Sequence, residues 1–222
     1  MSILLLHLET STKVCSVALS QDGAVIGFLD RVGDGFIHGE QLTLMIEELL
    51  EKQQVKLQDL HAISYSSGPG SYTGLRIGLS TAKGLCFALQ IPLIAIPTHQ
   101  SLLQIGLSQL AEKERTIVCM LDARRMEVYL EVYNFQGHTI QPLACQIIDE
   151  KALDAYLPCL VVGDSNEKVA AVIEDPRVVY IEANISAKYQ SNIAFDQYQK
   201  QKFEDLAYCS PIYLKGANGV LL

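Results

Sequence analysis

The sequence predicts an α/β protein made of two tandem, related halves, of which the second is abbreviated. Short apolar runs of strand length alternate with longer stretches of helical periodicity. The same strand-turn-strand pattern begins twice along the chain. Of the 222 residues, 49% are hydrophobic and 19% are charged. A chain of this length and composition can bury a core in one large domain or two small ones.

The first half has the predicted element order β-β-β-α-β-α-β. Asp22 and Gly23 form a tight turn between the second and third strands. In the helix predicted at 40–54, apolar residues recur on one face at 3.6-residue periodicity. The second helix, at 73–90, follows a Gly-rich turn. The predicted strands cover residues 3–8, 14–19, 24–29, 62–66 and 93–96.

A second copy of this pattern begins at residue 116. The strand 116–122 ends in an acid, as the first strand does, and the strand 127–133 is followed by a turn at 134–137. Later strands are predicted at 160–163 and 178–181, and helices at 100–114 and 192–206. We therefore expect domains at 1–105 and 106–222, with the last stretch, about 187–222, returning to pack on the first domain.

Three antiparallel strands followed by α-β-α-β, given twice, predict tandem ribonuclease H-like (actin/Hsp70-like) halves with mixed sheets flanked by helices. In catalytic members of that superfamily, acids at the end of the first strand often hold a metal–nucleotide complex. Here those acids are Glu9 and Asp122. An acid at a strand end is also ordinary, so both interpretations remain open.

The stretch from Ser67 to Gly78 is a Gly-rich turn between a buried strand and a helix. Such a turn directs backbone N–H groups at whatever lies beyond the helix N-terminus. It lacks the Lys-Ser/Thr ending of a P-loop, so a simple structural turn is the competing interpretation. The candidate nucleotide or phosphate contacts are Glu9, Ser11, Gly70, Ser71 and Asp122.

Small residues form a ridge along the helix at 73–90, because Gly74, Gly78, Ala82 and Cys86 follow one another at i+4 steps. Each glycine inside a helix costs roughly 1 kcal/mol relative to alanine, so the ridge needs a packing reason. It allows another backbone to approach closely. The partner could be the chain's own sheet or another subunit.

The composition favours a cytoplasmic protein that does not bind nucleic acid by itself. The net charge is −8, and phosphate contact needs Lys and Arg, so a partner would hold any nucleic acid. No segment approaches the ~18 uninterrupted apolar residues of a membrane span. The N-terminus predicts a strand rather than a signal peptide. The six cysteines contain no Cys-x-x-Cys pair and predict free thiols in a reducing compartment.

No local motif for a metal site or a nucleophile is present. The five histidines contain no i+3 or i+4 pair, and the sequence lacks Gly-x-Ser-x-Gly. We therefore expect no metal and no catalytic residue. His38 is interpreted as structural, and His99 as a surface or capping histidine.

Several strings resemble the TsaB family, also called YeaZ. The resemblance covers residues 1 to about 135 well and resumes near 187–215. Its most specific string runs from Gly68 to Gly78. The strings are the N-terminal Leu-His-Leu-Glu-Thr-Ser-Thr-x-x-Cys-Ser-Val-Ala-Leu, His-Gly-Glu at 38–40, Gly-Pro-Gly-Ser-Tyr-Thr-Gly-Leu-Arg-Ile-Gly at 68–78, Ala-Lys-Gly-Leu at 82–85, Asp-Ala-Arg-Arg-x-Glu-Val-Tyr at 122–129 and Pro-Ile-Tyr-Leu-Lys at 211–215.

The resemblance implies a non-catalytic scaffold subunit in the synthesis of N6-threonylcarbamoyladenosine at position 37 of tRNA. The implied partners are the paralogous catalytic subunit TsaD and the ATPase TsaE, with tRNA contacted only indirectly. No cofactor is implied, except ATP or ADP at an interface with partner subunits. TsaD-type proteins carry a metal-binding His-x-x-x-His pair, and this chain has His99 but Leu103.

The implied interface is a helical bundle built from 40–54 and 73–90, which a homodimer could also use. The alternative function is a stand-alone glycoprotease-like peptidase or a nucleotide hydrolase on an actin-like fold. The predicted interface residues are Leu42, Met45, Ile46, Leu49, Tyr72, Gly74, Leu75, Gly78, Leu79 and Ala82.

Overall fold

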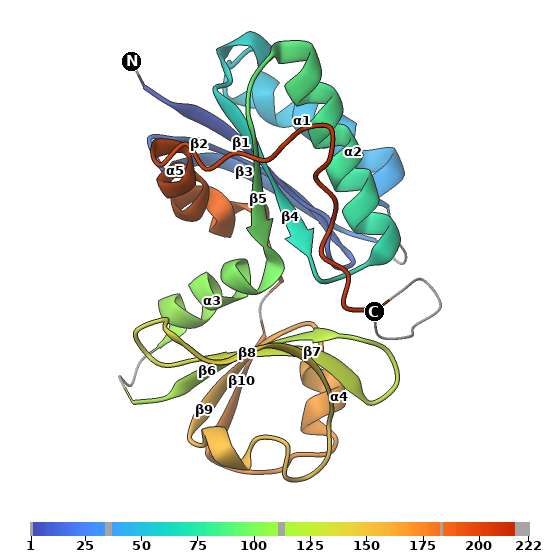
Figure 1. Cartoon of the computed structure of the whole chain (residues 1–222), viewed down its shortest axis with the longest axis vertical. Helices are drawn as coiled ribbons and strands as arrows, with labels where there is room; N and C mark the ends of the chain where they lie inside the picture. The colour runs from blue at the N-terminus through green and yellow to red at the C-terminus, as the bar shows by residue number, and fades with distance from the viewer. Residues whose placement is uncertain (1, 34–36, 111–113, 183, 216–222) are drawn as a thin grey trace. The chain divides into compact units, whose positions relative to one another are not determined.

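The computed structural model describes residues 2–33, 37–110, 114–182 and 184–215. The chain forms two compact units. Unit 1 consists of Met1–Thr98 and Ser186–Tyr213, and unit 2 consists of His99–Ile185 and Leu214–Leu222. Each unit contains one five-stranded sheet (Figure 1). The predicted two-part α/β fold with mixed sheets is confirmed.

The sheet of unit 1 has the strand order β3-β2-β1-β4-β5. The first three strands are antiparallel, and β4 and β5 run parallel to β1. The strands are β1 (Leu4–Glu9), β2 (Val14–Gln21), β3 (Ala24–Val32), β4 (Ala62–Gly68) and β5 (Leu93–Pro97). Because the central strands β1 and β4 are covered on both faces, nearly all of their residues are buried, including polar ones such as His7 and Ser64.

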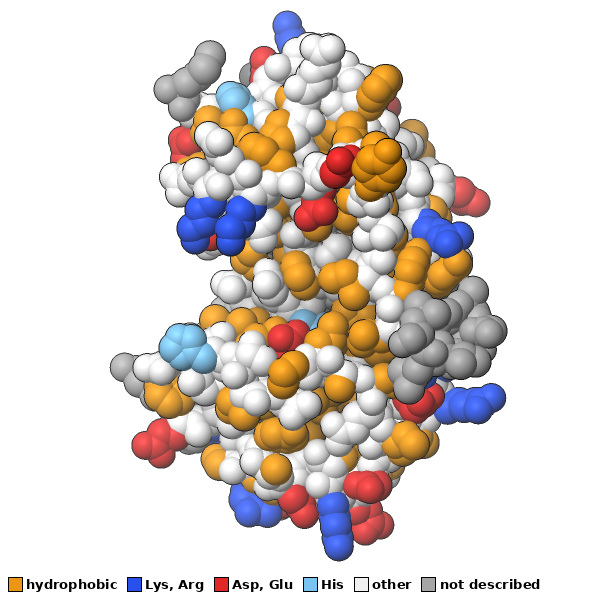
Figure 2. All heavy atoms as spheres, viewed as in Figure 1, with side chains coloured by type: hydrophobic (Ala, Val, Ile, Leu, Met, Phe, Trp, Pro, Cys, Tyr) orange, Lys and Arg blue, Asp and Glu red, His pale blue; other side chains and the backbone are white. Residues whose placement is uncertain are grey.

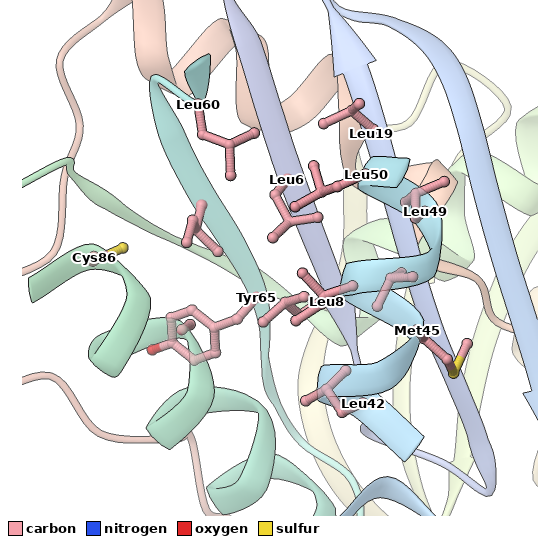
Figure 3. Packing of buried hydrophobic residues seen from close by; sticks show 14 of the residues in the cluster. Leu6, Leu8, Leu19, Leu42, Met45, Leu49, Leu50, Leu60, Tyr65 and Cys86 are labelled. Carbon is pink, nitrogen blue, oxygen red and sulfur yellow. The ribbon is translucent and has the colours of Figure 1, made fainter. Parts of the chain in front are cut away.

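Helices cover both faces of this sheet (Figure 1). On one face, α1 (His38–Lys52) and α2 (Tyr72–Leu89) enclose the main core. Figure 3 shows Leu6 and Leu8 of β1 within this cluster, together with Leu42 and Met45 of α1. On the other face, α5 (Ser191–Gln199) packs on β5 and β1, beside η3 (Ala187–Gln190). The short η1 (Leu57–Asp59) precedes β4.

The sheet of unit 2 has the order β10-β9-β6-β7-β8. One face carries a core that includes Val118, Leu130 and Val161. The other face contacts α3 (Thr98–Gln109), in which Gly106 lies close to Ile117. The remaining elements are β6 (Thr116–Asp122), β7 (Glu127–Tyr133), β8 (Thr139–Ile147), η2 (Asp154–Tyr156), β9 (Cys159–Gly163), α4 (Asn166–Ala170) and β10 (Val178–Ile181).

The structure differs from the sequence prediction at several elements. Strand β8 and helix α4 were not predicted, and α5 ends at Gln199 instead of 206. The chain passes from unit 1 to unit 2 after Thr98 rather than after 105, because α3 packs on the second sheet. Strand β3 is longer than the predicted strand 24–29, since it extends to Val32.

Among the described residues, none of the helices combines the length and the apolar character needed to cross a membrane.

Candidate functional site: the glycine-rich turn and its surroundings

The Gly-rich turn joins β4 to α2 in unit 1. Gly68 has φ +105°, a conformation that L side chains rarely adopt, and a Cβ there would overlap the carbonyl oxygen of Ile212. Ser71 is the N-cap of α2, and its Oγ accepts a hydrogen bond from the N–H of Gly74 at 3.1 Å. The turn therefore places the helix N-terminus where the sequence analysis expected it.

The loop between β1 and β2 fills the space in front of this turn. The N–H of Ser71 donates to the carbonyl oxygen of Ser11 at 2.6 Å. A Cβ added at Gly70 would overlap Ser11, and one added at Gly74 would overlap the carbonyl oxygen of Thr10. The backbone N–H at Ser71, which a bound phosphate would need, is thus used within the chain.

The same loop accounts for part of the small-residue ridge on α2. A Cβ at Gly78 would overlap Oγ1 of Thr10, and His38 on α1 donates from Nε2 to the carbonyl oxygen of Thr12 at 2.8 Å. At Gly74 and Gly78, the close neighbour is therefore the chain's own loop. Gly84, by contrast, has nothing within 4 Å of an added Cβ.

Glu9, at the end of β1, is completely buried and faces into the protein. One carboxylate oxygen accepts from the N–H and the Oγ of Ser11, at 2.8 Å and 2.6 Å, and the other accepts from Oγ of Ser66. Burial raises the pKa of Glu9, and the hydrogen bonds from Ser11 and Ser66 act in the opposite direction. The carboxylate of Glu9, a candidate nucleotide contact from the sequence, is occupied by internal donors.

A chain of buried polar side chains continues from Ser66 across the sheet. Nε2 of Gln190 donates to Ser66 at 3.3 Å, and Oε1 of Gln190 accepts from Oγ of Ser64 at 2.7 Å. Because Ser64 donates its proton to Gln190, it accepts from Nδ1 of His7 at 2.7 Å, and Nε2 of His7 accepts from Ser20 at 2.7 Å. Burial lowers the pKa of His7 to about 3.

This network connects the returning segment, through Gln190, to strands β1, β2 and β4. No sequence pattern predicted it. The available signal was the occurrence of polar residues, such as His7 and Ser64, inside strands that are otherwise apolar. A buried polar residue of this kind needs a hydrogen-bond partner, which can come from anywhere in the chain.

Asp122, at the end of β6 in unit 2, has different surroundings from Glu9. Its side chain is 49% exposed and accepts from Nζ of Lys168 at 2.8 Å. The N–H of Arg124 donates to it at 2.6 Å, and the N–H of Asp122 donates to Asp164 at 2.8 Å. Of the five candidate phosphate contacts, Glu9, Ser11, Gly70 and Ser71 lie together in unit 1, and Asp122 belongs to unit 2.

Comparison with known proteins gives concordant matches. The family model TsaD, described as tRNA N6-adenosine threonylcarbamoyltransferase, matches residues 37–208. The tRNA threonylcarbamoyladenosine biosynthesis protein TsaB of Escherichia coli K12 is 27% identical over 225 residues, covering 95% of this chain and 94% of the relative. TsaB of Bacillus subtilis 168 is 30% identical over 178 residues, covering 77% and 75%. The chain belongs to the TsaB (YeaZ) family.

Solved structures agree with this family assignment. YeaZ from Pseudomonas aeruginosa is 28% identical and has a TM-score of 0.82, covering 96% of this chain and 100% of that one. Part of the chain is also similar to an enzyme: the tRNA N6-adenosine threonylcarbamoyltransferase of Pediococcus pentosaceus is 32% identical over 109 residues. That match covers 42% of this chain and 31% of the enzyme. Membership of the TsaB family places the chain in tRNA threonylcarbamoyladenosine biosynthesis.

The structure shows where the predicted interface residues of this TsaB protein lie, and the interface itself stays a prediction. The apolar stripes of α1 and α2 face the protein's own sheet, as amphipathic helices of a globular core do. The buried residues from the predicted set are Leu42, Met45, Ile46, Leu49, Leu75, Leu79 and Ala82. Gly74 and Gly78 contact the loop of Thr10 instead. A partner that binds these helices therefore meets their other side.

The outward side of the two helices carries separated apolar side chains among polar ones. Phe87 of α2 is 79% exposed and Leu44 of α1 is 53% exposed. Both lie off the apolar stripe of their helix, so a closer reading of the helical periodicity could have identified them. α1 contains four glutamates and one lysine, whereas α2 contains no acidic residue.

Tyr72, the remaining member of the predicted set, is half-buried at the start of α2. The guanidinium of Arg76 lies 4.1 Å from the centroid of its ring. Nε of Arg76 donates to the hydroxyl of Tyr213 at 3.1 Å. The ring centroids of Tyr72 and Tyr213 are 4.9 Å apart. These contacts hold Arg76 in a fixed position on the outward side of α2.

His99 is not the surface or capping histidine that the sequence analysis expected. It is fully buried in the first turn of α3, and Nε2 donates to the carbonyl oxygen of Tyr129 at 3.0 Å. Burial lowers its pKa to about 4. In the described ranges, no three His, Cys, Asp or Glu side chains are grouped so that they could hold a metal ion.

Proposed function

We propose that this TsaB-family chain is a non-catalytic subunit that binds and activates a TsaD-like threonylcarbamoyltransferase. The observation that supports this most strongly is that residues of the chain itself fill the space in front of the Gly-rich turn of unit 1. Ser11 and Thr10 occupy the position in front of α2, and Ser11 also caps the carboxylate of Glu9. A catalytic relative would need these donors and this carboxylate to face a ligand.

A TsaD-like partner fits the similarity between this chain and the enzyme. The chain resembles a threonylcarbamoyltransferase over 109 residues, so the two proteins share part of their fold. We place the contact on the outward side of α1 and α2, around Leu44, Arg76 and Phe87. A TsaE-like ATPase and a second copy of this chain are further proposed partners, the latter through the same helices.

We further propose that tRNA is contacted mainly by the partner subunits. The net charge of −8 disfavours phosphate binding by this chain alone. Figure 2 shows Lys and Arg side chains dispersed among acidic and apolar ones on the face in view. ATP or ADP would bind at an interface to which the partner contributes.

The proposal predicts that substitutions on the outward side weaken partner binding. We expect Phe87→Asp to raise the Kd for the TsaD homologue of the same organism at least ~10-fold, because a charge would replace an exposed aromatic side chain at the contact. Isothermal titration calorimetry measures this. The matched control is Ile147→Asp in unit 2, where an apolar side chain is 66% exposed.

Equal affinity of the wild type and Phe87→Asp would contradict the placement of the contact. Hydrolysis of ATP or of a peptide by the purified chain alone, abolished by a substitution at Glu9, would instead support the stand-alone enzyme that the sequence analysis kept as an alternative.

A further inference from the structure

The segment after α5 forms a strap, residues 202–213, that runs alongside α2 (Figure 1). Hydrogen bonds fix it to the rest of unit 1, including the one from Arg76 to Tyr213. The N–H of Glu204 donates to the carbonyl oxygen of Leu93 at 2.9 Å, and the N–H of Ile212 donates to that of Ser67 at 2.7 Å. Between them, Nζ of Lys83 on α2 donates to the carbonyl oxygen of Ala207 at 3.4 Å.

Two cysteines lie where the strap meets the C-terminal half of α2. Cys86 is buried at the edge of the main core, and its Sγ donates to the carbonyl oxygen of Pro92 at 3.5 Å. Cys209 is half-buried and packs against the same cluster. Lys83 precedes Cys86 by three residues and Ala207 precedes Cys209 by two, so the contact between the Lys83 side chain and the Ala207 backbone lies near both cysteines.

The two thiols belong to the same cluster of packed side chains. Burial raises the pKa of the Cys86 thiol to about 12, and the neighbouring Cys209 thiol contributes to this increase. Burial also raises the pKa of Tyr65, and Cys209 adds to this increase; the ring of Tyr65 points toward α2 in Figure 3. Cys209 packs against the cluster that contains Cys86 and Tyr65, and these two pKa effects agree with that position.

We propose that Cys86 and Cys209 form a redox-modification site, in which an intramolecular disulfide ties the strap to α2. The oxidant is a small-molecule disulfide such as oxidised glutathione. The Cys209 thiolate attacks one sulfur of the oxidant, forms a mixed disulfide and releases one glutathione thiolate. The Cys86 thiolate then attacks the Cys209 sulfur, forms the protein disulfide and releases the second glutathione thiolate.

The surroundings of the two thiols determine the order of these steps. Cys209 is the more exposed, so the oxidant reaches it first. Cys86 then resolves the mixed disulfide. Because its pKa is about 12, only a small fraction of Cys86 is thiolate near neutral pH. The second step is therefore slow at pH 7 and accelerates about tenfold per pH unit up to pH 9.

The sequence allows the bond to be identified directly. We would incubate the full chain with oxidised glutathione at pH 8.5, block remaining thiols at acid pH, denature the protein and digest it with trypsin. Cys86 is the one cysteine between Lys83 and Lys113, and Cys209 the one between Lys202 and Lys215. Mass spectrometry should find peptides 84–113 and 203–215 linked, and reduction should separate them.

Variants provide the controls. Cys86→Ala should leave Cys209 as a mixed disulfide with glutathione, and Cys209→Ala should leave Cys86 unmodified. Cys145→Ala, which changes another half-buried cysteine, should retain the linked peptides. A wild-type chain in which Cys209 carries only glutathione, remains reduced or is linked to a different cysteine would overturn the proposal.

A second measurement tests whether the bond fits the native fold. A disulfide compatible with the native positions closes a long loop and should raise the Tm of the oxidised chain by several degrees relative to the reduced chain. A lower Tm after oxidation would show that the bond forms only in a distorted state, which would also overturn the proposal.

Discussion

The two units have the same sheet topology and very different helices. Each sheet has three antiparallel strands followed by two that are parallel to the first, in the orders β3-β2-β1-β4-β5 and β8-β7-β6-β9-β10. Unit 1 inserts helices of 15 and 18 residues between its last strands, whereas unit 2 inserts 3₁₀ and α segments of 3 and 5 residues. The sheet thus defines the fold, and the long helices provide unit 1 with an additional outward surface.

The acids at equivalent strand ends show the same contrast at the level of one residue. Glu9 ends β1 and is buried among three hydrogen-bond donors, whereas Asp122 ends β6 and is half-exposed in an ion pair with Lys168. The equivalent position in the fold therefore does not determine the role of the carboxylate. Its surroundings do.

The largest expected effect on stability comes from a substitution that displaces the loop of Thr10 from the Gly-rich turn of unit 1. We expect Gly74→Ala to lower the free energy of unfolding by about 3 kcal/mol, because its Cβ would overlap the carbonyl oxygen of Thr10, a backbone atom that cannot move alone. Gly84→Ala, on the same helix, should instead raise it by about 1 kcal/mol, since its Cβ meets open space. Urea denaturation of both variants measures the difference.

Equal stabilities for the two alanine variants would mean that the loop of Thr10 does not pack against α2 as described.

The next effect distinguishes the two acids. Glu9→Gln places an amide where three donors converge, and we expect it to reduce the free energy of unfolding by about 2–3 kcal/mol. Asp122→Asn removes one partly exposed ion pair and should reduce it by less than about 1 kcal/mol. Chemical denaturation at pH 7 compares them. A larger loss for Asp122→Asn would reverse the proposed contrast between the units.

A smaller, pH-dependent effect concerns His99 of unit 2. Its native pKa is about 4, below the value of about 6.5 of an unfolded histidine, so below pH 6.5 the unfolded chain binds a proton that the native chain does not. The stabilisation is complete above pH 6.5 and is lost as the pH falls toward 4. At pH 5 the loss is about 2 kcal/mol.

His99→Gln should flatten this part of the stability profile, measured by urea denaturation between pH 7 and pH 4.5. His138→Gln, at an exposed position, serves as the control. An unchanged slope in His99→Gln would show that the buried imidazole does not cause the loss.

The fold was predictable because its signals are local. Strands β6, β7 and β10 match the predicted boundaries, since apolar runs and turn residues delimit them. Strand β8 was missed because it is an edge strand that contains Pro142, and its residues are mostly half-exposed without clear alternation. The five-residue helix α4 is too short to show helical periodicity.

The site was only partly predictable, because its contacts join segments that are far apart in the sequence. The small residues at Gly74 and Gly78 correctly indicated a close backbone approach, but the sequence could not show that Thr10 makes it. The apolar stripe of α1 is equally consistent with a core or an interface. In the structure it packs on the sheet of unit 1 and forms part of the core. The partners of His7 and Ser64 lie 13 to 126 residues away.

The proposed role is tested most directly by assaying threonylcarbamoylation of unmodified tRNA. The assay combines the TsaD and TsaE homologues and the adenylate-forming enzyme of the same organism, with and without this chain. We predict that product forms only when the chain is present and that the chain alone modifies nothing. Full activity without the chain, or turnover by the chain alone, would contradict its role as a non-catalytic, activating subunit.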